Sequence, residues 1–564
     1  MVEASAKASA GRRRLVLRNG KLITVNARFD IAQALAIEAG RIIAVGSDAE
    51  IAPLVDAATE VIDLGGRAAV PGLIDAHAHM DREGLKQALP SLAGVRTIDD
   101  ILQRIAALVR ERAPGEWIVT MPIGEPPEFE GMPDLLRERR FPTRRELDRV
   151  APDNPVFIKP GWGYWRVSMP LVGIANSRAL EAAGITDQTQ SPAASLEIDR
   201  DAGGAPTGIF RDFNVMPILE LTLMRAVPAF DLATRISALR RSMQIYNSFG
   251  TTSVFEGHGV AGDVIAAYQH VRETGPSVRA TLLLSPAWPA TTDADIRAMI
   301  RGWGRWLAGR GLGDDWLRIA GLFTEVDTSP EHGLRKAAFP NTGWAGFNYA
   351  GLPRAAVREL FGECARNGIR VEVIGTELLD LIAEVAREAP IAGQRWVLAH
   401  VSTLDQRQID VLRDLGLCVT THTNSFIYRQ GAAWRARVGV AREDEIVPLR
   451  RLLDTAIPVA LATDNVPVSL WQPIWQTVAR VERTTNAPIA PAQALTREEA
   501  LRCATMGGAF LTFDEERKGS LEPGKLADVA VLSHDPLTCE LDQLRNTVAE
   551  LTIVGGDVVF DRAH

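Results

Sequence analysis

Short runs of hydrophobic residues alternate with amphipathic helical stretches along most of the chain. Eight runs have the length and composition of buried strands. Strands that alternate with helices pair in parallel, and a closed TIM-type (β/α)8 barrel is the simplest α/β arrangement for eight of them. The expected strands are Ala69 to Ala76, Thr252 to Phe255, Arg279 to Leu284, Leu317 to Glu325, Arg370 to Ile374, Trp396 to Ala399, Cys418 to Thr421 and Ile457 to Ala462.

A long stretch separates the first expected strand from the second. Residues 84–248 are too many for one helical crossover, so we expect an inserted subdomain there. At both ends of the chain, short strands broken by turn residues predict two halves of one small β-sandwich. The predicted domains are therefore residues 13–70 and 518–564, which form the sandwich, and residues 71–517, which form the barrel with its insertion.

Composition and charge limit the partners. The chain has 564 residues, 46% of them hydrophobic, and a formal net charge of −8. Because acidic and basic residues are interspersed, we expect a small-molecule substrate and no nucleic acid. No run reaches the roughly 18 apolar residues of a membrane-spanning helix, and the first residues lack the apolar segment of a secretory signal. We therefore expect a soluble, cytoplasmic protein that does not bind membranes.

Histidines follow the ends of several expected strands. The first strand ends at His77 and His79, and because residues i and i+2 point to the same side, both imidazoles face the barrel interior. TIM barrels build their sites at this end of the strands, where two imidazoles can bind one divalent ion. By the same rule Glu256 and His258 share a face, as metal ligands or as groups that support them. His422, after the seventh strand, is predicted to contact substrate.

The segment from Val70 to Asp81 resembles the amidohydrolase superfamily, whose first barrel strand ends in a PG(F/L)xDxHxH motif. Two further segments, Gly40 to Gly46 and Gly519 to Asp528, are similar to the terminal β-domain of that family. Within the family, the insertion with Asn176 to Leu180 resembles the branch that includes N-substituted formamide deformylases. The resemblance covers nearly the whole chain and implies a hydrolase that uses a divalent metal, with Zn²⁺ expected.

The resemblance implies further ligands at later strands. His400 falls where the sixth strand supplies a histidine, and Asp464 matches the eighth-strand aspartate that touches the metal and takes a proton from water. Phe323 stands where many relatives carry a carboxylated lysine, and Glu325 is a candidate substitute. Glu372 stands where the fifth strand should supply a histidine. It is predicted to be a metal ligand or, alternatively, to orient substrate or a neighbouring histidine.

These residues predict one firmly held ion, with a second recruited only through the glutamates or His258. The expected reaction is hydrolysis of a C–N bond in an amide, N-formyl compound or carbamate, with Asp464 as general base. Trp162 and Trp165 of the insertion are expected to line a pocket for an apolar or aromatic substrate. A deaminase of an aminoheterocycle and a non-catalytic scaffold are the alternatives. A homodimer or homotetramer is expected.

Overall fold

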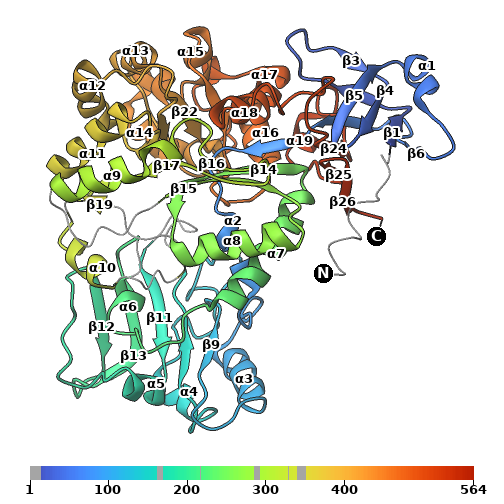
Figure 1. The fold of residues 1–564 in the computed structure, drawn as a ribbon. Helices are drawn as coiled ribbons and strands as arrows, with labels where there is room; N and C mark the ends of the chain where they lie inside the picture. The colour runs from blue at the N-terminus through green and yellow to red at the C-terminus, as the bar shows by residue number, and fades with distance from the viewer. Residues whose placement is uncertain are drawn as a thin grey trace, which may run out of the picture.

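The computed structural model of the protein describes residues 14–126, 128–161, 169–215, 218–284, 293–327, 329–338, 344 and 351–563. Within these residues, eight parallel strands form a nearly closed barrel, as the sequence predicts (Figure 1). The amide of Ala76 donates to the carbonyl of Leu461 at 3.1 Å, which joins the first strand to the last. In order around the barrel, the strands are β8 (Leu73–Asp75), β14 (Thr251–Val260), β15 (Arg279–Leu284), β17 (Leu317–Phe323), β20 (Val371–Ile374), β21 (Val397–Ala399), β22 (Cys418–Thr421) and β23 (Val459–Leu461).

Helices cover the outside of the barrel, so its strands are buried on both faces and read as continuous hydrophobic runs. Phe255, Leu283 and Phe323 fill the interior as part of one buried cluster. None of the helices in the described residues is long and apolar enough to cross a membrane. The covering helices include α8 (Gly262–Thr274), α9 (Asp293–Leu307), α11 (Arg354–Arg366), α12 (Leu379–Glu388), α13 (Gln406–Leu415), α15 (Leu449–Asp454) and α17 (Arg497–Ala504) (Figure 1).

The first expected strand, Ala69 to Ala76, is divided at Gly72. A Cβ at this position would lie 2.1 Å from Thr252 Oγ1, so only glycine allows the two chain segments to approach this closely. Before Gly72, β7 (Ala68–Pro71) pairs with β24 (Val529–Leu532), whereas β8 after it pairs with β14 in the barrel. One hydrophobic run therefore contributes a strand to each of two different sheets.

Two sheets built from the chain ends lie beside the barrel, at the upper right of Figure 1. In the described residues, one sheet has the order β5-β4-β1-β6 and the other the order β26-β25-β24-β7-β2-β3, so both chain ends contribute to the second. A buried cluster that includes Leu17, Leu35, Val529 and Ile553 packs between them. The remaining strands are β1 (Arg14–Arg18), β2 (Lys21–Ile23), β3 (Ile31–Ala32), β4 (Ala34–Glu38), β5 (Arg41–Gly46), β6 (Glu60–Asp63), β25 (Ala549–Val554) and β26 (Asp557–Asp561).

The chain between β8 and β14 forms a layer of its own below the barrel in Figure 1. Its described residues contain a sheet of order β12-β13-β11-β10-β9 with its own buried cluster, which includes Ile105, Ile118 and Val156. Helix α7 (Leu232–Asn247) then returns the chain to the barrel. The elements of the layer include α3 (Ile98–Val109), β9 (Ile118–Thr120), α4 (Arg144–Asp148), β10 (Val156–Ile158), β11 (Leu171–Ala175), α5 (Ser177–Ala182), β12 (Leu196–Arg200) and β13 (Pro206–Asp212).

A buried carboxylate, Asp514, ties the barrel floor to the segment that returns to the terminal sheets. Arg318 of β17 donates to Asp514 Oδ1 at 3.0 Å, and Arg310 donates to the same oxygen at 2.9 Å. Lys518 Nζ lies 3.6 Å from Asp514 Oδ2. Although burial alone would raise it, these cations hold the pKa of Asp514 well below its usual range. The carboxylate therefore balances several positive charges at once.

Asp514→Asn is expected to lower the free energy of unfolding by about 3–5 kcal/mol, because it leaves buried cations without their counter-charge. Chemical denaturation measures the effect. Asp380→Asn is the control, because Asp380 and Arg407 form an ion pair whose side chains are 66% and 72% exposed and should contribute little. Equal unfolding free energies for the two variants would contradict the proposed role of Asp514.

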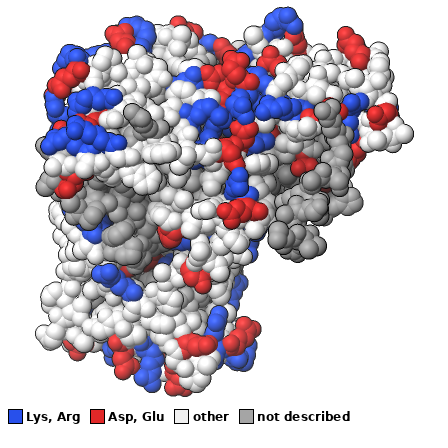
Figure 2. All heavy atoms as spheres, viewed as in Figure 1, with Lys and Arg blue, Asp and Glu red and all other residues white. Residues whose placement is uncertain are grey.

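On the face shown in Figure 2, acidic and basic side chains are interspersed, and many lie next to a side chain of opposite charge.

Candidate metal centre

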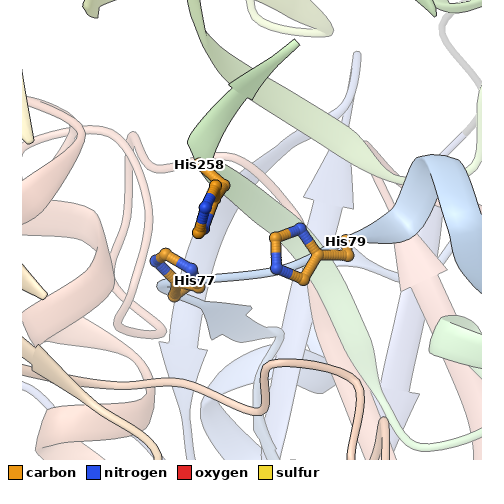
Figure 3. A group of neighbouring side chains, drawn as sticks. All are labelled: His77, His79 and His258. Carbon is orange, nitrogen blue, oxygen red and sulfur yellow. The ribbon is translucent and has the colours of Figure 1, made fainter. Parts of the chain in front are cut away.

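Among the described residues, five histidines converge at the carboxyl ends of the barrel strands. His77 lies at their centre, with ring centroids 4.6 Å from His400, 5.3 Å from His79, 5.7 Å from His258 and 6.4 Å from His422. Figure 3 shows His77 and His79, from the segment after β8, and His258, from β14, with their rings turned toward one another. The barrel thus assembles imidazoles that lie far apart in the sequence.

Burial keeps most of these imidazoles neutral, which is the form that binds a metal ion. It lowers the pKa of His79 to about 3 and the pKa of His422 to about 4. It also holds the pKa values of His258 and His400 well below the usual range, and the neighbouring histidines add to this effect. These four rings are therefore available as ligands at neutral pH.

Glu372 contacts His77 rather than the centre of the cluster. Its Oε1 lies 2.7 Å from His77 Nδ1, and both side chains are fully buried. Although burial favours the neutral ring, the carboxylate raises the pKa of His77. The contact occupies Nδ1 and leaves Nε2 for the centre. The contact suits one of the roles predicted for Glu372, orientation of a neighbouring histidine. The other role, as a metal ligand, stays a prediction.

Two pairs of potential ligand atoms have the spacing of neighbouring ligands on one ion. His77 Nε2 lies 3.1 Å from His400 Nε2, and His79 Nε2 lies 2.9 Å from Asp464 Oδ1. Two nitrogens bound at about 2.0–2.1 Å to a tetrahedral Zn²⁺ would be about 3.3 Å apart. The ligand atoms of His77, His400 and Asp464 all lie within 4.8 Å of one another. This donor set fits a single divalent ion.

Asp464 lies between two histidines. Its Oδ1 faces His79 Nε2, and its Oδ2 lies 3.6 Å from His422 Nε2. Although burial alone would raise it, His422 and His79 hold the pKa of Asp464 well below its usual range. The backbone is left-handed at Asp464 (φ 52°) and at His400 (φ 56°), a conformation uncommon outside glycine and frequent at functional sites. Both residues are therefore presented by turns that follow the strands.

A second group of potential ligand atoms in the described residues comprises His77, His79 and His258. Because His77 Nδ1 is bonded to Glu372, only its Nε2 is free, and that atom also faces His400. One imidazole nitrogen binds one ion. The His258 group and the His400 group therefore share His77 Nε2.

A third group comprises His79, Asp81 and Glu256. The guanidinium of Arg82 contacts His79 Nδ1 and lies 3.4 Å from Asp81 Oδ1, so a positive charge of the chain already lies there. Glu256 accepts a hydrogen bond from the buried Tyr268 hydroxyl. Its Oε2 lies 4.0 Å from His79 Nδ1, and its role as a metal ligand or as a supporting group stays a prediction.

Glu325 is in none of the three groups of potential ligands found in the described residues. β17 ends at Phe323, and after Thr324 the chain forms β18 (Glu325–Val326), which pairs with β19 (Gly351–Leu352) outside the barrel sheet. Burial raises the pKa of Glu325 to about 7. The expectation that Glu325 shares a face with Phe323 fails because the strand is interrupted between them. Phe323 itself packs on His258, with ring centroids 4.4 Å apart.

A cavity of about 450 Å³ opens beside His400. Its walls are the loops after β20 and β21 and helix α14 (Gly431–Val438). Glu377, Arg437 and Trp434 are among its lining residues, and the Arg437 guanidinium lies 5.1 Å from the Trp434 ring. The described wall next to the candidate metal centre is therefore polar, with one aromatic side chain.

The residues predicted to contact substrate fall in different places. His422 belongs to the histidine cluster, and its ring packs on Phe426 with centroids 4.6 Å apart. The ring centroids of Phe426 and Trp434 are 6.4 Å apart, so aromatic side chains lie between the histidine cluster and the cavity. Trp162 and Trp165 lie outside the described residues.

Two residues that the sequence reasoning missed tie the first barrel strand to the last. Asp75 accepts hydrogen bonds from Thr463 N at 3.0 Å and Thr463 Oγ1 at 2.5 Å, and burial raises the pKa of Asp75 to about 7. Asn465 contacts the backbone of His79, 386 residues away in the sequence. Asp75 stands inside the motif around His77, whereas no signal in the sequence points to Asn465.

A parallel barrel with histidines and an aspartate gathered at the carboxyl ends of its strands can bind a divalent ion where TIM-barrel enzymes build their sites. Residues 60–560 match the Amidohydrolase family. The chain belongs to this family, as the motif at its first barrel strand predicts.

Relatives and a solved structure resemble the chain over nearly its whole length. It is 27% identical to the N-substituted formamide deformylase of Arthrobacter pascens, with 98% of this chain and 99% of the relative covered. It is 25% identical to Protein LONG AFTER FAR-RED 3 of Arabidopsis thaliana, with 97% and 91% covered. The crystal structure of an uncharacterized metal-dependent hydrolase from Pyrococcus horikoshii has a TM-score of 0.67 at 20% identity and covers 94% of this chain and 99% of that one. The last likeness supports the fold.

Proposed function

We propose that the protein hydrolyses the C–N bond of a small amide, N-formyl compound or carbamate at a single-metal centre. The observation that carries the proposal is the pair of short distances, 3.1 Å between His77 Nε2 and His400 Nε2 and 2.9 Å between His79 Nε2 and Asp464 Oδ1. The relative named as an N-substituted formamide deformylase makes an N-substituted formamide the first compound to test.

His77, His79, His400 and Asp464 would hold the ion. Three imidazoles and one carboxylate suit Zn²⁺. Bound there, such an ion lowers the pKa of water and polarises the scissile carbonyl. One ion is proposed because the group with His258 requires the same nitrogen of His77.

Asp464 carries the proton transfer. Its carboxyl group is ionised at neutral pH, because its pKa lies well below the usual range, so it accepts a proton from the attacking water. The carbonyl carbon gains a bond to the water oxygen, and its bond to nitrogen breaks. The proton held by Asp464 then passes to the leaving nitrogen. The products of an amide are an amine and a carboxylate, which is formate when the substrate is an N-formyl compound. A carbamate gives an amine and a carbonate monoester, which loses carbon dioxide to leave an alcohol.

Glu372 would orient His77, and Gly257 leaves room for its carboxylate. A Cβ at position 257 would lie 2.3 Å from Glu372 Oε1 and 2.7 Å from Glu372 Oε2. Gly257→Ala is therefore expected to displace the carboxylate, release the His77 ring and weaken metal affinity by ~10–100-fold. Competition with a chelator of known affinity measures the change.

Gly262→Ala is the matched control for Gly257→Ala, because a Cβ at position 262 would have no atom within 4 Å. Its metal affinity should equal that of the unmodified protein. If the two variants bind metal equally well, the contact between Glu372 and His77 does not support the site.

A substrate screen with purified, metal-loaded protein tests the reaction. The compounds are N-formyl, N-acyl and carbamate derivatives of amines, together with aminoheterocycles. Apolar aryl and polar N-substituents are both included, because Trp162 and Trp165 predict an apolar pocket whereas the cavity beside His400 has polar walls. We expect release of an amine together with a carboxylate, or together with carbon dioxide and an alcohol when the compound is a carbamate. Ammonia release without a carboxylate would indicate a deaminase, and metal binding without any turnover would indicate a scaffold; either result would contradict the proposal.

A further inference from the structure

We propose that Asn465 is a positioning residue that holds His79 and Asp464 at the spacing of two ligands of one ion. The inference rests on the proposed metal centre. Asn465 directly follows Asp464, is 2% exposed and has a left-handed backbone with φ 58°. Asparagine adopts this conformation more readily than most residues, so the turn places a short amide side chain beside the segment that carries His79.

The side-chain amide of Asn465 uses all of its hydrogen-bonding capacity. Its Oδ1 accepts from the backbone N–H of His79 at 2.8 Å and from the Tyr246 hydroxyl at 2.8 Å. Its Nδ2 donates to the carbonyl of His79 at 2.9 Å and to Glu83 Oε2 at 2.9 Å. An asparagine amide has two donors and an acceptor with two lone pairs, so every position is satisfied.

The two bonds to His79 fix its backbone from both sides. The amide pairs with both the N–H and the carbonyl of His79, as a residue of an adjacent strand would. The backbone N–H of Asp464 also donates to the carbonyl of His77 at 3.1 Å. Asp464 and Asn465 are thus joined to His77 and His79, and His79 Nε2 lies 2.9 Å from Asp464 Oδ1. A site whose supporting contacts are already formed loses less conformational freedom when the ion binds.

The other two partners of the Asn465 amide, Tyr246 and Glu83, are themselves held in place. Tyr246 lies in helix α7 and is fully buried. Lys86 Nζ lies 2.7 Å from the Glu83 carboxylate. Asn465 is therefore held by a helix and by an ion pair as well as by the segment that it positions.

Asn176 provides a matched control. It is also fully buried, accepts two hydrogen bonds from backbone N–H groups and donates two to backbone carbonyls, but it lies in the layer below the barrel. Replacement of Asn176 by alanine therefore removes the same number of hydrogen bonds from a buried amide away from the metal centre. Any general loss of stability should appear in both alanine variants.

The test measures Zn²⁺ affinity by chelator competition, and the visible absorption of the Co²⁺-loaded protein, for Asn465→Ala, Asn465→Asp and Asn176→Ala. Thermal unfolding of each metal-free protein establishes that it is folded. Asn465→Ala is expected to weaken Zn²⁺ affinity by ~10–100-fold and to alter the Co²⁺ spectrum. Asn465→Asp keeps the shape of the side chain but replaces the NH₂ donor by a carboxylate oxygen, which the His79 carbonyl and the Glu83 carboxylate repel. It should therefore also weaken Zn²⁺ binding. Asn176→Ala should lower stability and leave both metal readouts unchanged.

Unchanged Zn²⁺ affinity and Co²⁺ spectrum in a folded Asn465 variant would overturn the inference. An equal loss of affinity in Asn176→Ala would also overturn it, because the effect would then be general destabilisation. Failure of the unmodified protein to bind Zn²⁺ would overturn the proposed function itself, and is distinguished from the other outcomes because no substitution is involved.

Discussion

Asp464→Asn is expected to lower kcat by ~10²–10⁴-fold while the protein stays folded and keeps its metal. The substitution preserves the size of the side chain and an oxygen that can face His79. The remaining ligands, His77, His79 and His400, are unaffected. An amide cannot accept the proton of the attacking water, so the loss should appear in turnover rather than in metal content. Steady-state kinetics with the best amide of the screen and metal analysis of the same sample measure both.

Asp380→Asn is the control for this substitution, because Asp380 is exposed on helix α12, in an ion pair remote from the histidine cluster. It should have the turnover of the unmodified protein. Full activity of the Asp464→Asn protein would contradict the assignment of the general base. Loss of metal together with activity would show that the carboxylate acts mainly as a ligand.

His77→Ala is expected to abolish metal loading, and with it turnover. The substitution removes the nitrogen that lies 3.1 Å from His400 Nε2 and that both candidate ligand sets require. It also leaves the buried carboxylate of Glu372 without the imidazole that it contacts. Metal analysis after dialysis against Zn²⁺ measures the result, and circular dichroism of the metal-free protein checks the fold.

His270→Ala is the control for loss of a histidine, because His270 is exposed on helix α8. It should keep the full metal content. A His77→Ala protein that retains one ion per chain would contradict the placement of His77 at the centre of the site.

The barrel strands could be predicted because burial on both faces makes them continuous hydrophobic runs. Several strand boundaries differ from the predicted ones. For example, β14 continues to Val260, beyond the predicted end at Phe255. Ala69 to Ala76 is divided at Gly72, where the chain passes from one sheet to another. β17 ends at Phe323, two residues before the predicted end at Glu325. Hydrophobicity identifies which residues are buried but not the residue at which pairing stops.

The metal ligands differ in how far the sequence predicts them. The spacing of His77 and His79 is sufficient to predict that both are ligands, because the strand period places both side chains on one face. The sequence leaves the role of Glu372 open between a metal ligand and a group that orients substrate or a neighbouring histidine, because a carboxylate at that position can turn toward any of them. Asn465 could not be predicted, because its role depends on a left-handed turn and on a partner 386 residues away. Such contacts exist only once the barrel has closed.

Metal stoichiometry of the unmodified protein, followed together with turnover, tests the central claim most directly. Metal-free protein is titrated with Zn²⁺, and bound metal per chain and the rate of amide hydrolysis are measured at each step. The account predicts that binding saturates at one ion per chain and that turnover rises in proportion and stops increasing there. Turnover that requires a second ion, or full turnover without metal, would contradict a single-metal centre built on His77, His79, His400 and Asp464.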